Sequence, residues 1–383
     1  MNSYISNFRK ALIAALCLTF IAEFASLSIL SVTLQGARQV VQFKRDIARK
    51  QIFTEEDAKD KKIVLFFGNS QISAGIVPGL FDDESGDKTL SFNFALPGTP
   101  FAPQFFLFKD YLVNNPSPDY IVMSFDDIEL SDETSISYSV QGASLTEAMK
   151  LWIKYRNTEI LSQYFIPSRY HWPRIENFFI GKLLEFLPDK IRNIHKKGYI
   201  SKHLKKETYP HDWDQLYDSR FNDFNKNTLK IERSLLADRG YYYIEEQAVK
   251  GGSLNKELFS NNSNDNAVPM PNNKIIKYDP PKKTFTDDFF KLVIKNNIKV
   301  LFINTYTFSE KGDNIDSNAR TTSCKWTYFK NKYPNNVFFS GDGSMKVYGC
   351  DLFSDPTHLN PKGADMYTRD IYLELKGLIW ENS

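Results

Sequence analysis

Four short apolar runs of strand-forming residues recur along this chain, separated by stretches with helical periodicity such as TDDFFKLVIKNN. The runs are KIVLFF (62–67), DYIVMSF (119–125), IKVLFIN (298–304) and NNVFFS (335–340). Short continuous apolar runs bounded by polar or turn residues are typical of strands buried on both faces. Because these runs alternate with helical patterns, the sequence predicts an α/β fold, a three-layer sandwich with a mainly parallel sheet.

The first 35 residues contain one long apolar stretch. Residues 11–34 read ALIAALCLTFIAEFASLSILSVTL, in which Glu23 is the only charged residue. A membrane-crossing helix needs about 20 apolar residues, whereas the apolar core of a signal peptide usually has about 7–15. We therefore expect residues 1–35 to form one transmembrane helix, with a cleaved signal peptide as the alternative.

The remaining chain is expected to lie outside the cytoplasm, in the periplasm or at the cell surface. Residues 36–60 are charged and helix-compatible, and they predict a juxtamembrane spacer. Residues 61–383 are predicted to form the extracytoplasmic domain. The strand–helix alternation stops over about 131–280, which predicts a large, mostly helical insertion within this domain.

Aromatic residues make up 15% of the sequence, and some fall in the insertion. Trp152, Tyr155 and Trp172 are candidate platforms for stacking on sugars, with core packing as the alternative. The formal net charge is only +2, from 48 basic and 46 acidic residues. Proteins that bind nucleic acid usually carry a clear basic excess, so we expect no nucleic-acid partner.

The cysteines and histidines do not have the spacing of a zinc site, so the sequence predicts neither a metal nor a cofactor. Cys324 and Cys350 both lie in the C-terminal part of the chain. An even pair in an exported domain is compatible with a disulfide, and two free thiols are the alternative.

The first apolar run is followed by GNSQISAG, in which Ser70 stands where a strand would turn into a helix. Ligands of open α/β sheets bind at this end of the strands. Gly68 permits a tight bend, although Ile72 occupies the position of the second glycine in a G-x-S-x-G elbow. A serine hydroxyl is a weak nucleophile unless a neighbouring base accepts its proton.

The stretch DPTHLN (355–360) supplies a candidate base near the end of the chain. Asp355 and His358 are three residues apart and can meet on one face of a turn. Asp355 would then fix the tautomer of His358, whose other ring nitrogen would accept the proton of Ser70. The alternative is a helix-capping aspartate beside a surface histidine.

A third motif, NFALPG, lies between these two, with Asn93 on an expected short strand and Gly98 in the loop after it. The backbone N–H groups of Gly98 and Ser70 could together form an oxyanion hole. The alternative for Gly98 is an ordinary Pro-Gly turn.

The order of these motifs resembles the SGNH (GDSL-like) hydrolase superfamily over residues 62–130 and 285–380. The resemblance implies that Ser70 is the nucleophile of a triad with Asp355 and His358. It also implies that oxyanion or substrate binding falls to three residues, Gly98, Asn93 and Asn69.

Two departures from the superfamily pattern stand out. Asn69 occupies the position of the usual aspartate in the first motif. In the third motif the family has an asparagine that completes the oxyanion hole, whereas this chain has Asp126 and Asp127. A carboxylate there would repel an oxyanion.

An N-terminal anchor followed by a divergent SGNH domain is similar to the proteins of D-alanyl transfer and alginate O-acetylation. This similarity implies an O-acyltransferase that esterifies a hydroxyl of a cell-surface glycan, beside a polytopic membrane-bound O-acyltransferase as partner. The alternatives are an esterase or deacetylase of the same superfamily, and a non-catalytic scaffold of an acylation complex.

Overall fold

The protein was analysed as a computed structural model of the 383-residue chain, in which two compact units are distinguished. One unit comprises Met1–Gln39 with Ala148–Thr228, and the other comprises Val40–Glu147 with Leu229–Ser383. The structure describes residues 37–97, 99–124, 133–140, 142–165, 238–241, 285–308, 326–340, 345–355 and 357–380, together with positions 10, 13, 14, 17 and 21.

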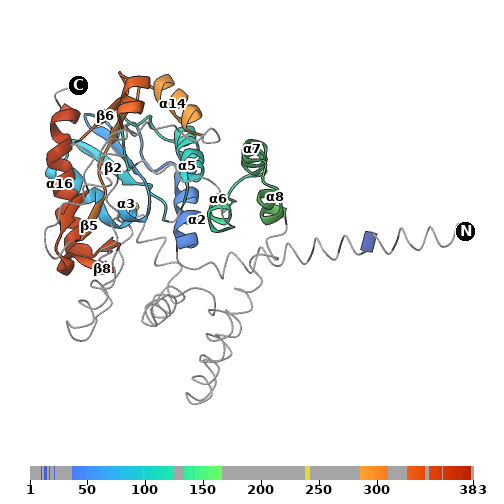
Figure 1. Ribbon diagram of the computed structural model, residues 1–383. Helices are drawn as coiled ribbons and strands as arrows, with labels where there is room; N and C mark the ends of the chain where they lie inside the picture. Colours follow the sequence, from blue (N-terminus) through green and yellow to red (C-terminus); the bar gives the residue numbers. More distant parts are fainter. Residues whose placement is uncertain are drawn as a thin grey trace, which may run out of the picture. The chain divides into compact units, whose positions relative to one another are not determined.

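A five-stranded parallel sheet lies at the centre of the larger unit (Figure 1). Its strand order is β2-β1-β3-β4-β6, and every neighbouring pair is parallel. The strands are β1 (Lys62–Phe67), β2 (Thr89–Asn93), β3 (Tyr120–Met123), β4 (Lys299–Phe302) and β6 (Val337–Phe339). The predicted α/β class with a mainly parallel sheet is therefore confirmed, and the four apolar runs correspond to β1, β3, β4 and β6.

Helices cover both faces of this sheet, as Figure 1 shows with α16 on one side and α2 and α5 on the other. The first group is α3 (Ser70–Gly75), α4 (Pro78–Glu84) and α16 (Pro361–Trp380). The second group is α2 (Ala37–Ala48), α5 (Phe101–Asn114) and α14 (Thr286–Lys295). The helical pattern near the end of the sequence is confirmed by α16, which begins three residues earlier than its apolar periodicity.

Alternation along the strands explains why two helical layers are needed. Phe66 of β1 packs in a buried cluster with Phe81 of α4 and Tyr367 of α16. Its neighbour Phe67 points to the opposite face and lies edge-on to Phe108 of α5, with ring centroids 6.0 Å apart. Burying successive side chains on opposite faces removes apolar surface from water on both, which is the main source of stability for a parallel sheet.

Helix α2 is part of this folded unit, although residues 36–60 were expected to be a spacer leading up to residue 61. Val40, Val41 and Ile47 of α2 are fully buried. So are the charged residues Lys44 and Arg45, and the Arg45 guanidinium pairs with the Glu147 carboxylate at 2.6 Å. The folded unit therefore begins upstream of the expected boundary.

The described part of the predicted insertion includes helices α6 (Glu133–Val140), α7 (Leu145–Tyr155) and α8 (Thr158–Phe165). Trp152 and Tyr155 are half-buried, and Trp172 lies outside the described residues. A short segment at 238–241 borders strand β2, where the Arg239 carbonyl accepts a hydrogen bond from the Asn93 N–H at 2.8 Å.

Two small sheets lie near the C-terminal part of the chain. Strand β5 (Tyr306–Phe308) pairs in parallel with β7 (Lys346–Tyr348). After the short 3-10 helix η1 (Cys350–Leu352), strand β8 (Phe353–Asp355) pairs antiparallel with β9 (His358–Leu359), and α16 follows. These elements carry the chain from the main sheet to its last helix.

Several predicted features fall on residues that the structure does not describe. Apart from positions 13, 14, 17 and 21, the predicted anchor at 11–34 lies outside the described residues. No helix within the described part of the chain is both long and apolar enough to span a membrane. Cys324 also lies outside the described part, so its pairing with Cys350 stays a prediction.

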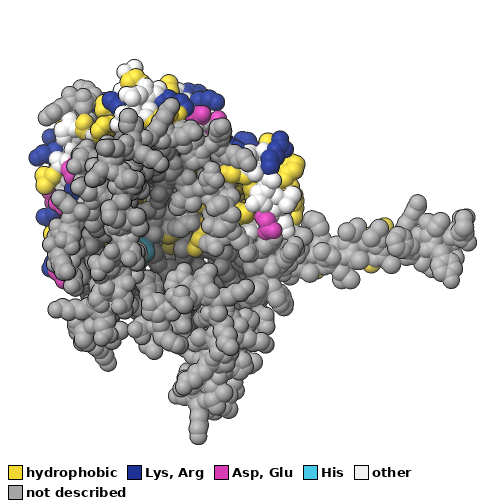
Figure 2. Space-filling view, in the orientation of Figure 1, with side chains coloured by type: hydrophobic (Ala, Val, Ile, Leu, Met, Phe, Trp, Pro, Cys, Tyr) yellow, Lys and Arg dark blue, Asp and Glu magenta, His cyan; other side chains and the backbone are white. Residues whose placement is uncertain are grey.

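Charged side chains of both signs are interspersed on the face shown in Figure 2. Ion pairs among the described residues include Lys332 with Asp287 at 2.6 Å and Lys62 with Asp119 at 3.5 Å. Among the residues coloured there, the basic side chains do not form the continuous stripe that a phosphate backbone requires. The absence of a nucleic-acid partner stays a prediction.

Candidate active site

Ser70 is the first residue of α3 and is half-buried, directly after the turn that ends β1. Gly68 makes this turn with φ of +146°, a conformation that side chains other than glycine rarely adopt. The Oδ1 atom of Asn69 then accepts a hydrogen bond from the Gln71 N–H at 2.9 Å, which caps the helix. Strand, glycine and cap together fix the position of Ser70 at the carboxyl edge of the sheet.

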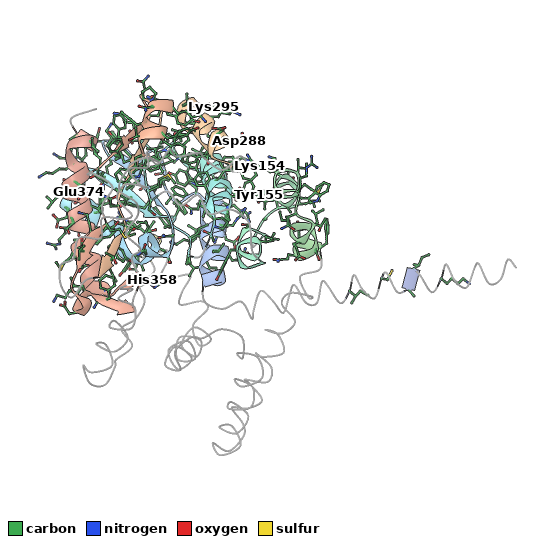
Figure 3. The ribbon with its side chains drawn as sticks, in the orientation of Figure 1. Lys154, Tyr155, Asp288, Lys295, His358 and Glu374 are labelled. Carbon is green, nitrogen blue, oxygen red and sulfur yellow. The ribbon has the colours of Figure 1, made fainter. Side chains whose placement is uncertain are left out.

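Asp355 and His358 are direct partners in the antiparallel ladder of β8 and β9. The sequence predicted a turn here, and the structure pairs the two segments as antiparallel strands. Opposite residues are the closest cross-strand neighbours in such a ladder. The His358 Nδ1 atom lies 2.9 Å from the Thr357 hydroxyl oxygen, while the side chain of Asp355 is outside the described part. Figure 3 labels His358 at the lower edge of the fold.

Helix α3 packs against β9, so the segments that carry Ser70 and His358 lie together. The Gln71 side-chain amide donates to the carbonyl oxygens of Tyr306, at 3.0 Å, and Thr357, at 3.4 Å. In return, the Tyr306 hydroxyl donates to the Gln71 carbonyl at 2.9 Å. These contacts join the start of α3 to the hairpin, although the two segments are 286 residues apart in the chain.

The loop after β2 runs beside the same turn. The Leu96 N–H donates to the Gly68 carbonyl at 2.9 Å, which aligns residues 94–96 with the end of β1. Gly98 itself lies outside the described residues, so its proposed part in an oxyanion hole stays a prediction.

Lys44 of α2 bonds to the loop after β2 and to helix α3. The sequence did not reveal these contacts. The Lys44 Nζ atom donates to the Ala95 carbonyl at 2.7 Å and to the Ser73 hydroxyl at 3.1 Å. The residue is completely buried, and burial holds the pKa of its amine well below the usual range. The only signal in the sequence was helical periodicity, in which Lys44 and Arg45 occupy the same face as the apolar positions.

Asn93 lies in the core and connects β2 to α3. Its Nδ2 atom donates to the carbonyl oxygens of Ile72 and Ile76, at 2.9 Å each, and its Oδ1 atom accepts from the Ala95 N–H at 3.1 Å. With no exposed surface, this side chain holds the end of α3 against the sheet. Its predicted part in substrate binding, like that of Asn69, stays a prediction.

Ser124 directly follows β3 at the same edge of the sheet and is 7% exposed. Its hydroxyl has no hydrogen-bond partner within the described part of the chain. Asp126 and Asp127 come two and three residues later and lie outside that part. Among the described residues no group of three or more His, Cys, Asp or Glu side chains could hold a metal ion, and the predicted absence of a metal stays a prediction.

Comparison with known proteins adds one family assignment. The family described as "Protein of unknown function (DUF1574)" matches residues 24–375. This chain belongs to that family. In this DUF1574 protein the matched region contains Ser70, His358 and the whole predicted insertion, so the candidate site and the insertion belong to the same family unit. No curated protein matches the chain.

Proposed function

We propose that this protein is a membrane-anchored, extracytoplasmic O-acyltransferase with an SGNH-like three-layer domain. It would move an acetyl or similar acyl group to a hydroxyl of a cell-surface polysaccharide. The observation that supports the proposal most is the contact between α3 and the β8–β9 hairpin. This contact gathers a serine at a strand–helix turn, a histidine and the aspartate opposite that histidine at one edge of the sheet.

The proposed reaction has two steps. Ser70 Oγ attacks the carbonyl carbon of the acyl donor while His358 accepts the hydroxyl proton. The oxyanion then collapses, the bond to the leaving group breaks, and His358 returns the proton to the leaving group. In the second step His358 accepts the proton of the glycan hydroxyl, whose oxygen attacks the ester on Ser70. Release of the acylated glycan returns the proton to Ser70.

The acyl donor is proposed to come from a polytopic membrane-bound O-acyltransferase. The larger unit begins at Val40, shortly after the predicted anchor at 11–34. The predicted anchor would keep the chain at the bilayer, where a membrane partner would release acyl groups. Half-buried Trp152 and Tyr155 stay candidate platforms for stacking on sugars, with core packing as the alternative.

The test uses the full-length chain in detergent micelles with p-nitrophenyl acetate as acyl donor. Intact-protein mass spectrometry should detect one acetyl group on the wild type, and peptide mapping should locate it on Ser70. Ser70→Ala should prevent labelling, and His358→Ala should slow it by at least about 1,000-fold because the hydroxyl loses its base. Ser144→Ala is the matched control, because this exposed serine caps α7 by accepting a hydrogen bond from the Glu147 N–H.

Addition of an oligosaccharide acceptor separates the alternatives. Transfer of the acetyl group to the sugar supports the proposal. Rapid release of acetate without transfer indicates an esterase or deacetylase. A wild type that forms no serine ester but binds a membrane acyltransferase tightly indicates a scaffold.

A further inference from the structure

Ser124 faces the turn that carries the predicted nucleophile. Phe67 of β1 and Met123 of β3 are register partners, so Ser124 is level with Gly68, the first residue of that turn. A Cβ atom on Gly68 would lie 2.6 Å from the Ser124 Oγ atom. The absence of a side chain at Gly68 therefore leaves room for this hydroxyl.

The hydroxyl of Ser124 differs from those of comparably buried serines. Ser340 directly follows β6 at the same edge of the sheet and is 6% exposed, against 7% for Ser124. The Ser340 hydroxyl donates to the Glu374 carboxylate at 2.7 Å, and the Ser91 hydroxyl donates to the Pro78 carbonyl at 3.0 Å. Within the described part of the chain, the Ser124 hydroxyl makes no such bond.

A buried hydroxyl without a partner is unfavourable, and a catalytic role is one of the explanations for such a group in a native protein. A donor that is desolvated before substrate arrives is effective toward a developing negative charge, because no water must be displaced from it. The two acidic residues that follow, Asp126 and Asp127, can only accept hydrogen bonds when ionised. Among the side chains of the SFDD stretch, the Ser124 hydroxyl is the neutral donor.

We infer that the Ser124 hydroxyl is a further catalytic group, which donates a hydrogen bond to the acyl oxygen as Ser70 attacks. This inference rests on the proposed acyl transfer. Attack on the carbonyl carbon moves the π electrons of the C=O bond onto oxygen, and the Ser124 O–H bond stabilises that charge without giving up its proton. When the intermediate collapses, the electrons re-form the carbonyl and the hydrogen bond weakens. The ligand class is therefore an acyl donor with an electrophilic carbonyl group, for which a carboxylic ester is the probe.

The experiment compares Ser124→Ala with Ser340→Ala in the full-length protein. Single-turnover labelling with p-nitrophenyl acetate gives the maximal rate and half-saturation concentration for acylation of Ser70, and thermal melting gives stability. Loss of one oxyanion donor should slow Ser124→Ala by about 100-fold or more at saturating ester, with little change in half-saturation. Its melting temperature should be unchanged or raised, because the variant loses an unpaired buried hydroxyl.

Ser340→Ala should show the opposite pattern, a lower melting temperature with wild-type acylation. Ser124→Gly provides a second variant that also lacks the hydroxyl, and it should be as slow as the alanine variant. If Ser124→Ala acylates Ser70 as fast as the wild type, the inference fails while acyl transfer stands. Loss of folding in both Ser124 variants would assign the residue to structure and overturn it as well. A wild type that forms no ester on Ser70 overturns both the inference and the proposed function.

Discussion

Gln71 donates a side-chain hydrogen bond to the carbonyl oxygen of Thr357, so a residue of α3 is joined directly to the β8–β9 hairpin. The same amide donates to the carbonyl of Tyr306, the first residue of β5. Three separate segments are therefore connected through one glutamine. Its neighbour Ser70 and the neighbour of Thr357, His358, are the proposed nucleophile and base, so the relative position of the pair depends on these bonds.

Gln71→Met keeps the length of this side chain and removes its amide. We expect about a tenfold slower acylation of Ser70, because small displacements of a base from its nucleophile reduce rates strongly. The free energy of unfolding should fall by only about 1 kcal/mol, the usual net contribution of such hydrogen bonds. Gln42→Met is the control, since its amide bonds Asp46 within α2. Equal acylation rates in both variants would contradict a positioning role for Gln71.

Gly68→Ala should destabilise the protein by about 2–3 kcal/mol or more, measured by urea denaturation. The φ angle of +146° disfavours a side chain, and the new Cβ would lie 2.6 Å from the Ser124 Oγ atom and 2.7 Å from the Ile72 Cγ1 atom. Gly79→Ala in α4 is the matched control, because nothing lies within 4 Å of its added Cβ. That variant should gain about 0.5–1 kcal/mol from helix propensity. Similar losses in both would indicate that space at Gly68 is not limiting.

Glu147→Gln should cost about 3–5 kcal/mol of unfolding free energy, because it leaves the fully buried Arg45 without its close carboxylate partner. A double variant, Arg45→Met with Glu147→Met, should recover much of that loss, since it removes both buried charges. Asp287→Asn disrupts a more exposed pair with Lys332 and should cost at most about 1 kcal/mol. A Glu147→Gln variant as stable as Asp287→Asn would show that water compensates the Arg45 charge.

Lys44 should make stability depend on pH in the alkaline range. Burial lowers its pKa in the folded protein below the usual 10.5, so between these two values the unfolded chain holds a proton that the folded chain does not. The contribution of Lys44 to stability should therefore rise with pH in that window, by up to about 1.4 kcal/mol per pH unit, and level off above the ordinary lysine pKa. Urea denaturation from pH 7 to 11 measures the slope.

Lys44→Met should remove this dependence. The exposed Lys376 of α16 provides the control, and Lys376→Met should keep the wild-type slope. A stability difference between the wild type and Lys44→Met that stays constant over the same pH range would contradict the assignment.

The sheet could be predicted from the sequence because burial on both faces leaves a simple pattern. KIVLFF coincides with β1, and the other three apolar runs each contain a strand of the sheet. Strand β2 was harder to recognise, because TLSFN alternates polar and apolar residues although all five are buried. Its buried polar side chains form hydrogen bonds with residues outside the strand. The Ser91 hydroxyl, for example, donates to the Pro78 carbonyl, and the pattern of the strand itself does not indicate such a bond.

The candidate site was predictable in its chemical groups but not in its supports. Ser70 and His358 stand out by residue type and by their place after a strand and before a helix. Gln71 and Lys44 do not, because a glutamine beside a serine and a lysine in a charged helix usually face solvent. Their roles arise from hydrogen bonds to backbone carbonyls of other segments, and any residue type can supply such a carbonyl.

The neighbouring strands β3 and β4 have consequences for the order in which the chain can fold. Their register joins Met123 to Phe302, so the centre of the sheet closes only after the whole insertion has been synthesised. The Tyr120 hydroxyl further donates to the Ile379 carbonyl at 2.9 Å, close to the end of the chain. Such non-local pairing slows folding, because the chain loses the entropy of long loops before the stabilising contacts form. A nascent chain, which is synthesised from its N-terminus, would therefore remain incompletely folded until translation ends.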